Sequence, residues 1–209
     1  MKLAKIEAKL KKLQPKWVGE KTIASITRGL NAAFTKSIVH FYSSRYDSEY
    51  YKHYSVIVSG QYNPRILSAI PEAIHITLSF PKDKKKVTIS EKEAEMLVMR
   101  IARAIHHEYR HKHQQKGRGW KYIKQYKPRI KKGRSRKLYY KSLYYGLPDE
   151  VDAHAYETQA EKFDINKLRQ AHKIGWRECE AIFMYRKTFR TQDPKVWKKF
   201  LKKVYKNIV

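Results

Sequence analysis

The sequence predicts an α+β fold in which helices precede and follow three consecutive strands. Apolar residues recur at helical spacing in residues 2–13 and 22–34, and again from residue 90 onward. Between these stretches lie three segments rich in β-branched and aromatic residues, SIVHFY, YSVIVSGQY and AIHITLSF. A chain of 209 residues with 42% hydrophobic residues can also bury one sizeable core, so we do not expect wholesale disorder.

The N-terminal half begins with an amphipathic helix over residues 2–13, which we expect Pro15 to end. A second helix is expected over residues 22–34. The three strands that follow are separated by Ser, Asp, Gly, Asn and Pro, and the third ends at Pro81 before a charged turn. An antiparallel meander is the most economical topology for them.

A long helix is expected from Ser90 to Gly117, because Ser90 and Glu93 form a capping box and Gly117 supplies a C-terminal stop. At about 100° per residue, one stripe of this helix is apolar. Glu108 falls on the edge of that stripe, where another apolar residue is expected. The stripe consists of Ala94, Leu97, Val98, Ile101 and Ile105.

The C-terminal half is strongly basic. Residues 116–145 contain twelve Lys or Arg, no Asp or Glu and seven aromatic residues, and their Gly and Pro residues predict a long loop or inserted arm. A helix is expected from Pro148 to Phe163, and two or three helices over residues 165–209. The last of these begins at Asp193 and separates its apolar residues from six lysines. This organisation predicts one domain over residues 1–163 and a basic helical extension over 164–209.

The charge balance predicts a polyanionic partner. With 47 Lys and Arg against 19 Asp and Glu, the formal net charge is +28, and we expect a nucleic acid or another polyanion nearby. The single cysteine, Cys179, excludes an intramolecular disulfide and any zinc site built from several thiolates. The sequence has no secretory signal and no apolar run long enough to span a membrane, so we expect an intracellular protein or one inside a virion.

The most informative motif is His107-Glu108-Tyr109-Arg110-His111, an H-E-x-x-H sequence inside the expected long helix. Residues four apart project from one side of a helix, so the two imidazoles can share a zinc ion. Glu108 is adjacent to the first ligand and can serve as a general base toward a bound water. The alternative is that a basic, histidine-rich helix contains this string by chance.

A zinc site of this kind needs a third protein ligand. Glu150, in the segment PDEVDAHAYE, is the best candidate, because it lies in the first turn of the next helix beside that helix's apolar stripe. Asp152 is expected to accept a hydrogen bond from the second nitrogen of a ligating imidazole. The alternative is that these carboxylates only complement the positive end of a helix.

The order of helix, three strands, H-E-x-x-H helix and acidic helix resembles the minimal core of zincin metallopeptidases of the gluzincin type. The pattern Glu150-x-x-Ala153-x-x-Tyr156 is similar to that of small zincin-like peptidases related to the ImmA/IrrE group, and to metallopeptidase-like proteins of tailed bacteriophages. The resemblance covers roughly residues 20–163. It implies that His107, His111 and Glu150 bind Zn²⁺ and that Glu108 is the catalytic base. It also implies that a strand just before the active helix, here residues 74–80, pairs with an extended peptide substrate.

The basic arm predicts non-specific nucleic-acid binding, because its cations can contact phosphates while its aromatic rings stack on bases. Two functions follow: a zinc peptidase that associates with nucleic acid or a nucleoprotein particle, or a nucleic-acid-binding or virion structural protein without peptidase activity. A solvated insertion is the alternative for the arm. The expected binding residues are Lys116, Arg118, Trp120, Lys121, Lys124, Lys127, Arg129, Lys131, Lys132, Arg134, Arg136, Lys137 and Lys141.

Overall fold

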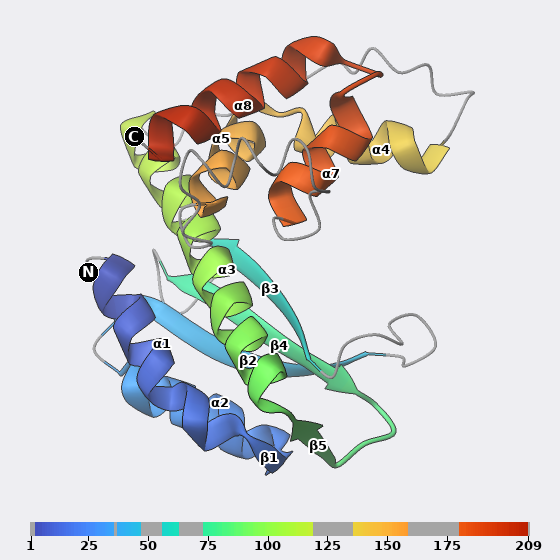
Figure 1. Ribbon diagram of the computed structural model, residues 1–209. Helices are drawn as coiled ribbons and strands as arrows, with labels where there is room; N and C mark the ends of the chain where they lie inside the picture. Colours follow the sequence, from blue (N-terminus) through green and yellow to red (C-terminus); the bar gives the residue numbers. More distant parts are fainter. Residues whose placement is uncertain are drawn as a thin grey trace. The chain divides into compact units, whose positions relative to one another are not determined.

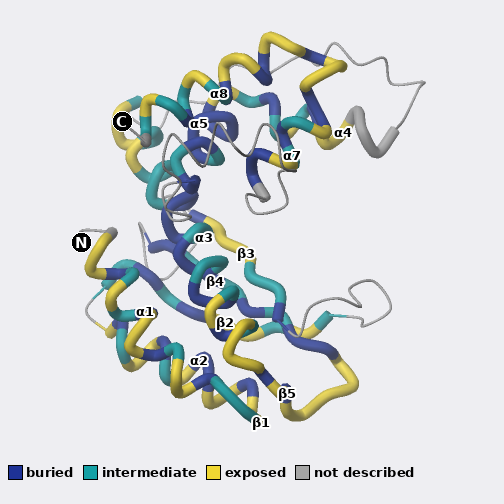
Figure 2. The backbone as a smooth tube through the Cα atoms, in the orientation of Figure 1, coloured by how far each residue is buried: buried dark blue, intermediate teal, exposed yellow. Residues whose placement is uncertain are grey.

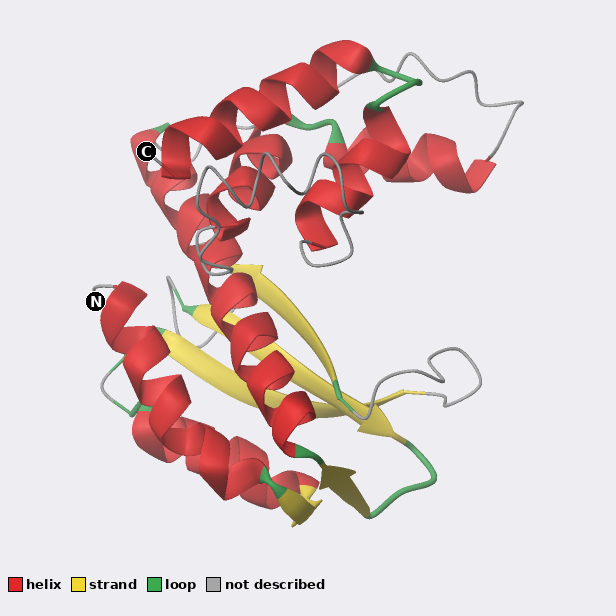
Figure 3. Cartoon of the chain, viewed as in Figure 1, coloured by secondary structure: helices red, strands yellow, loops and turns green. Residues whose placement is uncertain are grey.

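The computed structural model describes residues 3–35, 37–46, 56–62, 73–118, 136–158 and 180–208 (Figure 1). The α+β class is confirmed at this level, with helices and two small sheets (Figure 3). The chain divides into two compact units, residues 1–112 and 113–209. The division falls inside helix α3 (Glu91–Gly117). The expected domain boundary after residue 163 lies outside the described residues.

Unit 1 begins with helices α1 (Leu3–Trp17) and α2 (Ile23–Ala33). The expectation that Pro15 ends the first helix is wrong, because α1 continues for two residues beyond it. A proline in the last turn removes only one backbone hydrogen bond, and Trp17, 3% exposed, keeps that turn packed. Gly19 follows in a left-handed conformation with φ of 87°, which favours glycine.

The main sheet of unit 1 has three strands, β2 (Val39–Tyr46), β3 (Ile57–Tyr62) and β4 (Ile74–Pro81), in the order β2-β4-β3. The three expected strands are confirmed, but the expected meander is wrong, because β2 and β4 are parallel. Strand β4 is central, and its side chains Ile74, Ile76, Leu78 and Phe80 have no exposed surface. The most apolar strand therefore takes the central position. A second, unexpected sheet pairs β1 (Gly19–Thr22) with β5 (Lys86–Ile89).

The central position of β4 corrects a further expectation. Residues 74–80 were predicted to pair with a substrate, but β4 already has a neighbour on each side, so this is wrong. At the β2 edge, the Asn31 side chain of α2 donates to the carbonyl of Phe41 at 2.9 Å and accepts from its N–H at 3.0 Å. Helix α2 thereby satisfies main-chain groups at that edge. Strand β3 forms the other edge of the described sheet.

Helix α3 confirms the predicted capping box. The Ser90 N–H donates to Glu93 at 2.9 Å, and the Glu93 N–H donates to the Ser90 hydroxyl at 3.3 Å. The predicted apolar stripe is buried, and Glu108 continues it at 7% exposed. Figure 2 shows buried and less buried residues alternating along α3, as expected for a helix with one covered side. The predicted apolar stripe and the Glu108 carboxylate therefore lie on the same buried side of α3.

Unit 2 contains helices α4 (Arg136–Tyr145), α5 (Pro148–Glu157), α7 (Glu180–Phe189) and α8 (Pro194–Ile208). Residues 136–145 were expected in a loop or arm, and this is wrong. That segment lacks Gly and Pro, Ser142 is fully buried, and Tyr145 packs on the core. Residues 119–135 and 159–179, including Cys179, lie outside the description.

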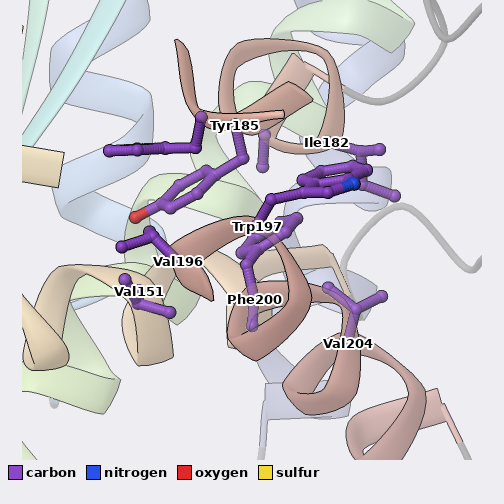
Figure 4. Close-up of a cluster of buried hydrophobic side chains, with 10 residues drawn as sticks. Val151, Ile182, Tyr185, Val196, Trp197, Phe200 and Val204 are labelled. Carbon is purple, nitrogen blue, oxygen red and sulfur yellow. The ribbon is translucent and has the colours of Figure 1, made fainter. Parts of the chain in front are cut away.

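The core of unit 2 joins α5, α7 and α8 (Figure 4). Its centre is the Tyr185 ring, stacked on Phe200 with ring centroids 4.1 Å apart. The expected apolar face of the last helix is thereby confirmed, and five of its six lysines are exposed. The buried members of the core are Val151, Ala155, Ala181, Ile182, Tyr185, Phe189, Val196, Trp197, Phe200 and Val204. No helix in the described part of the chain is long and apolar enough to cross a membrane.

Candidate metal centre

The two motif histidines converge on one side of α3 in unit 1. The Nε2 atoms of His107 and His111 lie 3.0 Å apart, and their rings are nearly perpendicular. His107 is 6% exposed and His111 is partly buried. Two nitrogens bound to one zinc ion at 2.0–2.1 Å in a tetrahedral arrangement lie about 3.3–3.4 Å apart. The imidazole pair is therefore within a few tenths of an ångström of the spacing that zinc requires.

Glu108 is held by the edge strand β3. Its Oε2 atom accepts a hydrogen bond from the Tyr62 N–H at 2.7 Å, and the carboxylate is 7% exposed. The same strand approaches the side chain closely at Gly60, where an added Cβ would lie 2.8 Å from Glu108 Cγ and 3.0 Å from Oε1. A glycine at this position thus leaves room for the carboxylate beside the strand.

In unit 2, α5 presents a buried group of ionisable side chains. Glu150 and Glu157 are 7% and 5% exposed, and His154 lies between them. The distances from the His154 imidazole are 3.8 Å to Glu150 and 3.3 Å to Glu157. The spacing of three and four residues places all three on one side of the helix. Residues of these types are ligands for zinc.

Tyr185 lies against this group from α7. Its ring centroid is 5.5 Å from that of His154, and its hydroxyl donates to the Tyr145 carbonyl at 2.8 Å. Burial, and then the neighbouring Glu150 and Glu157 carboxylates, raise the pKa of Tyr185 well above 10.0. Its hydroxyl is therefore neutral at physiological pH and remains a hydrogen-bond donor.

Asp152 makes contacts with the end of α3 and with α8. Its Oδ2 accepts from the Gln114 amide at 2.9 Å, and its Oδ1 pairs with Lys203. The Gln114 amide also donates to the Asp149 carbonyl at 3.1 Å. These bonds fix the first two turns of α5 to the last turns of α3 within unit 2. The predicted bond from Asp152 to a ligating imidazole stays a prediction.

The predicted nucleic-acid-binding residues fall mostly outside the description. Trp120 and the seven cations from Lys121 to Arg134 lie in the segment that is not described, as do the side chains of Arg136 and Lys137. Lys116 and Lys141 are exposed. Arg118 forms an ion pair with Asp149. Arg118 was expected to contact phosphate, but its guanidinium is already paired with this carboxylate.

Sequence reasoning missed four residues around these groups: Gly60, Tyr62, Gln114 and Glu157. Gln114 could have been found from the sequence, because it follows His111 by three residues and so lies on the same side of the helix. Glu157 likewise follows His154 by three residues. No sequence pattern could have identified Gly60 and Tyr62, because their role depends on how α3 packs on β3.

Histidine and glutamate side chains among the described residues could hold a metal ion. Comparison of the chain with protein families, with curated proteins and with solved structures finds no match in any of the three. A function can therefore be inferred only from the side chains themselves.

Proposed function

We propose that the protein is a zinc-dependent metallopeptidase whose basic surface associates with nucleic acid or a nucleoprotein particle. In this proposal His107, His111 and Glu150 bind the metal and Glu108 is the general base. The observation that carries it is the pair of converging imidazole nitrogens, 3.0 Å apart, next to a buried carboxylate held by the sheet edge. This combination is the one that the H-E-x-x-H motif of zincin metallopeptidases supplies.

The contacts of α5 with the end of α3 support Glu150 as the third ligand. Gln114 follows His107 by seven residues on α3, so the two project from the same side of that helix. The Gln114 amide bonds the first two turns of α5, where Glu150 lies. These bonds tie the first two turns of α5 to the turn of α3 that follows the H-E-x-x-H motif.

The donor set is suited to zinc. Two imidazoles and one carboxylate match the His₂Glu set of catalytic zinc sites, which keep a fourth position for water or substrate. Zinc bound there supplies a Lewis acid that polarises the substrate carbonyl and lowers the pKa of a bound water toward neutrality.

Glu108 performs the proton transfers in this proposal. Its hydrogen bond from Tyr62 fixes one carboxylate oxygen and so orients the group. Glu108 takes a proton from the water that attacks the peptide carbonyl, and passes it to the amine nitrogen as the carbon–nitrogen bond breaks. A buried, oriented carboxylate beside the reacting carbonyl serves both transfers.

The position of Glu108 also indicates where a peptide would bind. The Tyr62 N–H points to Glu108 instead of to β4, so the carboxylate lies at the outer edge of β3. An extended peptide that added a strand at this edge would pass beside Glu108. We therefore propose β3, in place of β4, as the strand that pairs with substrate.

Zinc analysis of the purified protein tests the ligand set. We expect one zinc per chain, and loss of zinc in Glu150→Gln. Glu157→Gln is the matched control, because Glu157 is equally buried on the same helix, and we expect it to keep the metal. Zinc retained in Glu150→Gln and lost in Glu157→Gln would instead assign the third ligand to the group around His154.

Peptidase activity is tested with a peptide library or casein. We expect cleavage by the wild-type protein, and at least a hundredfold loss in Glu108→Gln with zinc retained. Stoichiometric zinc without cleavage of any protein substrate would contradict the peptidase proposal. That result would favour the second function, a nucleic-acid-binding or virion structural protein, for which the net charge of +28 is the supporting observation.

A further inference from the structure

Helix α8 has two faces of opposite character. Its apolar side chains, including Val196, Phe200 and Val204, are buried in the core of unit 2 (Figure 4). At about 100° per residue, the opposite face is a stripe roughly 100° wide that contains only lysines. We call it the lysine stripe, and its five exposed members are Lys195, Lys198, Lys199, Lys202 and Lys206.

The lysine stripe is not neutralised within the described part of the chain. Helix α8 contains no Asp or Glu, and none of the five lysines has an ion pair with a described residue. The sixth lysine of the helix, Lys203, differs, because it pairs with Asp152 of α5. Like charges spaced three and four residues apart on a helix repel one another. A polyanion bound along the stripe would relieve this repulsion.

The spacing of the stripe matches a linear polyanion. Lys195, Lys199, Lys202 and Lys206 follow one another at intervals of four, three and four residues, which is about 4.5–6 Å of helix rise each. From end to end the stripe extends for about 16 Å. Duplex DNA carries one negative charge per roughly 1.7 Å of its axis, so several phosphates lie within that length.

We propose that the lysine stripe of α8 binds the phosphate backbone of a nucleic acid without reading its sequence. The inference rests on the proposed nucleic-acid association and names a surface for it outside the basic arm of residues 116–145. A membrane surface is the less suitable partner. A helix that lies in a membrane inserts its apolar face, and the apolar face of α8 is buried in the protein core.

The test compares two quadruple variants of the full chain. The stripe variant replaces Lys195, Lys199, Lys202 and Lys206 by glutamine. The control replaces the four exposed lysines of α1, Lys5, Lys11, Lys12 and Lys16, and so removes the same charge from unit 1. Binding to a mixed-sequence 20-base-pair DNA duplex is measured by fluorescence anisotropy between 50 and 200 mM salt. Glutamine is a good helix former, and circular dichroism checks folding.

For the stripe variant, we expect the slope of log K against log salt to become shallower by about 3.6, or 0.9 per lysine. Its affinity at 100 mM salt should fall at least tenfold, against threefold or less for the control. A third variant, with arginine at the four stripe positions, should keep the wild-type slope even if the glutamine variant folds poorly.

Three results would overturn the proposal. Equal losses in the two glutamine variants would show that only net charge matters. Loss of binding to vesicles containing phosphatidylserine, with DNA binding unchanged, would assign the stripe to membranes. A wild-type protein that does not bind DNA would refute the nucleic-acid association itself, whereas the zinc and cleavage measurements would still decide the peptidase proposal.

Discussion

Replacing Gly60 by alanine tests the contact between strand β3 and the proposed base. The new Cβ would lie 2.8 Å from Glu108 Cγ and 3.0 Å from Oε1, so the side chain must move. Movement breaks the 2.7 Å bond from the Tyr62 N–H, a loss of about 1.5–3 kcal/mol for a charged acceptor. Replacing a strand glycine otherwise stabilises by about 0.4–1 kcal/mol. We therefore expect net destabilisation of roughly 1–2 kcal/mol.

Urea unfolding measures this change, and a double-mutant cycle isolates its cause. In a Glu108→Ala background the obstructing side chain is absent, so Gly60→Ala should stabilise by about 0.5 kcal/mol. The coupling free energy between the two sites is then about 2 kcal/mol. Gly29→Ala is the control, because nothing lies within 4 Å of its added Cβ, and it should stabilise by about 0.5–1 kcal/mol. Equal effects of Gly60→Ala in both backgrounds would refute the reasoning.

Three further substitutions remove side-chain hydrogen bonds that stabilise one or the other unit. Their effect on the free energy of unfolding is measured with denaturant. Ser90→Ala removes the hydroxyl of the capping box and should cost about 1 kcal/mol, whereas no change would mean that α3 does not depend on this cap. Asn31→Ala leaves the N–H and carbonyl of Phe41 without their amide partner and should cost about 2 kcal/mol; a cost below 0.5 kcal/mol would contradict this assignment. Tyr185→Phe removes the donor to the Tyr145 carbonyl and should cost about 1 kcal/mol at pH 7. Burial raises the pKa of Tyr185 above its unfolded value near 10.0. The contribution of its neutral hydroxyl to the free energy of unfolding is therefore complete below pH 10 and declines above it. We expect the wild type to lose stability faster than Tyr185→Phe between pH 10 and 11.

Local signals in the sequence were sufficient for α2, α3 and the three strands of the main sheet of unit 1. They did not show the short strands β1 and β5 or the end of α1 at Trp17. The capping box at Ser90 and the 3.6-residue period locate α3, and the β-branched segments locate β2, β3 and β4. The order of the strands could not be predicted in this way. Alternation of buried and exposed residues shows which face of a strand is covered, but not which strand lies beside it. The parallel pairing of β2 with β4 is therefore a tertiary property.

Some features of the candidate site could likewise be predicted from the sequence, and others could not. The convergence of His107 and His111 follows from a spacing of four on a helix, and the misplaced Glu108 was visible as a carboxylate on an apolar stripe. The contact of Glu108 with Gly60 and Tyr62 was not visible, because it joins residues 46 or more positions apart. Bonds of that kind depend on the packing of α3 on the sheet.

The continuity of α3 has a consequence for dissecting the protein. The two compact units meet after Lys112, one residue beyond His111. A fragment expressed to that boundary would place the H-E-x-x-H sequence in the final turns of its helix, where the last four carbonyls lack helical partners and the ends fray. The histidine pair would lose its rigid spacing although every residue of unit 1 was present. Fragments of this protein should therefore be cut outside α3, with the whole helix kept on the N-terminal piece.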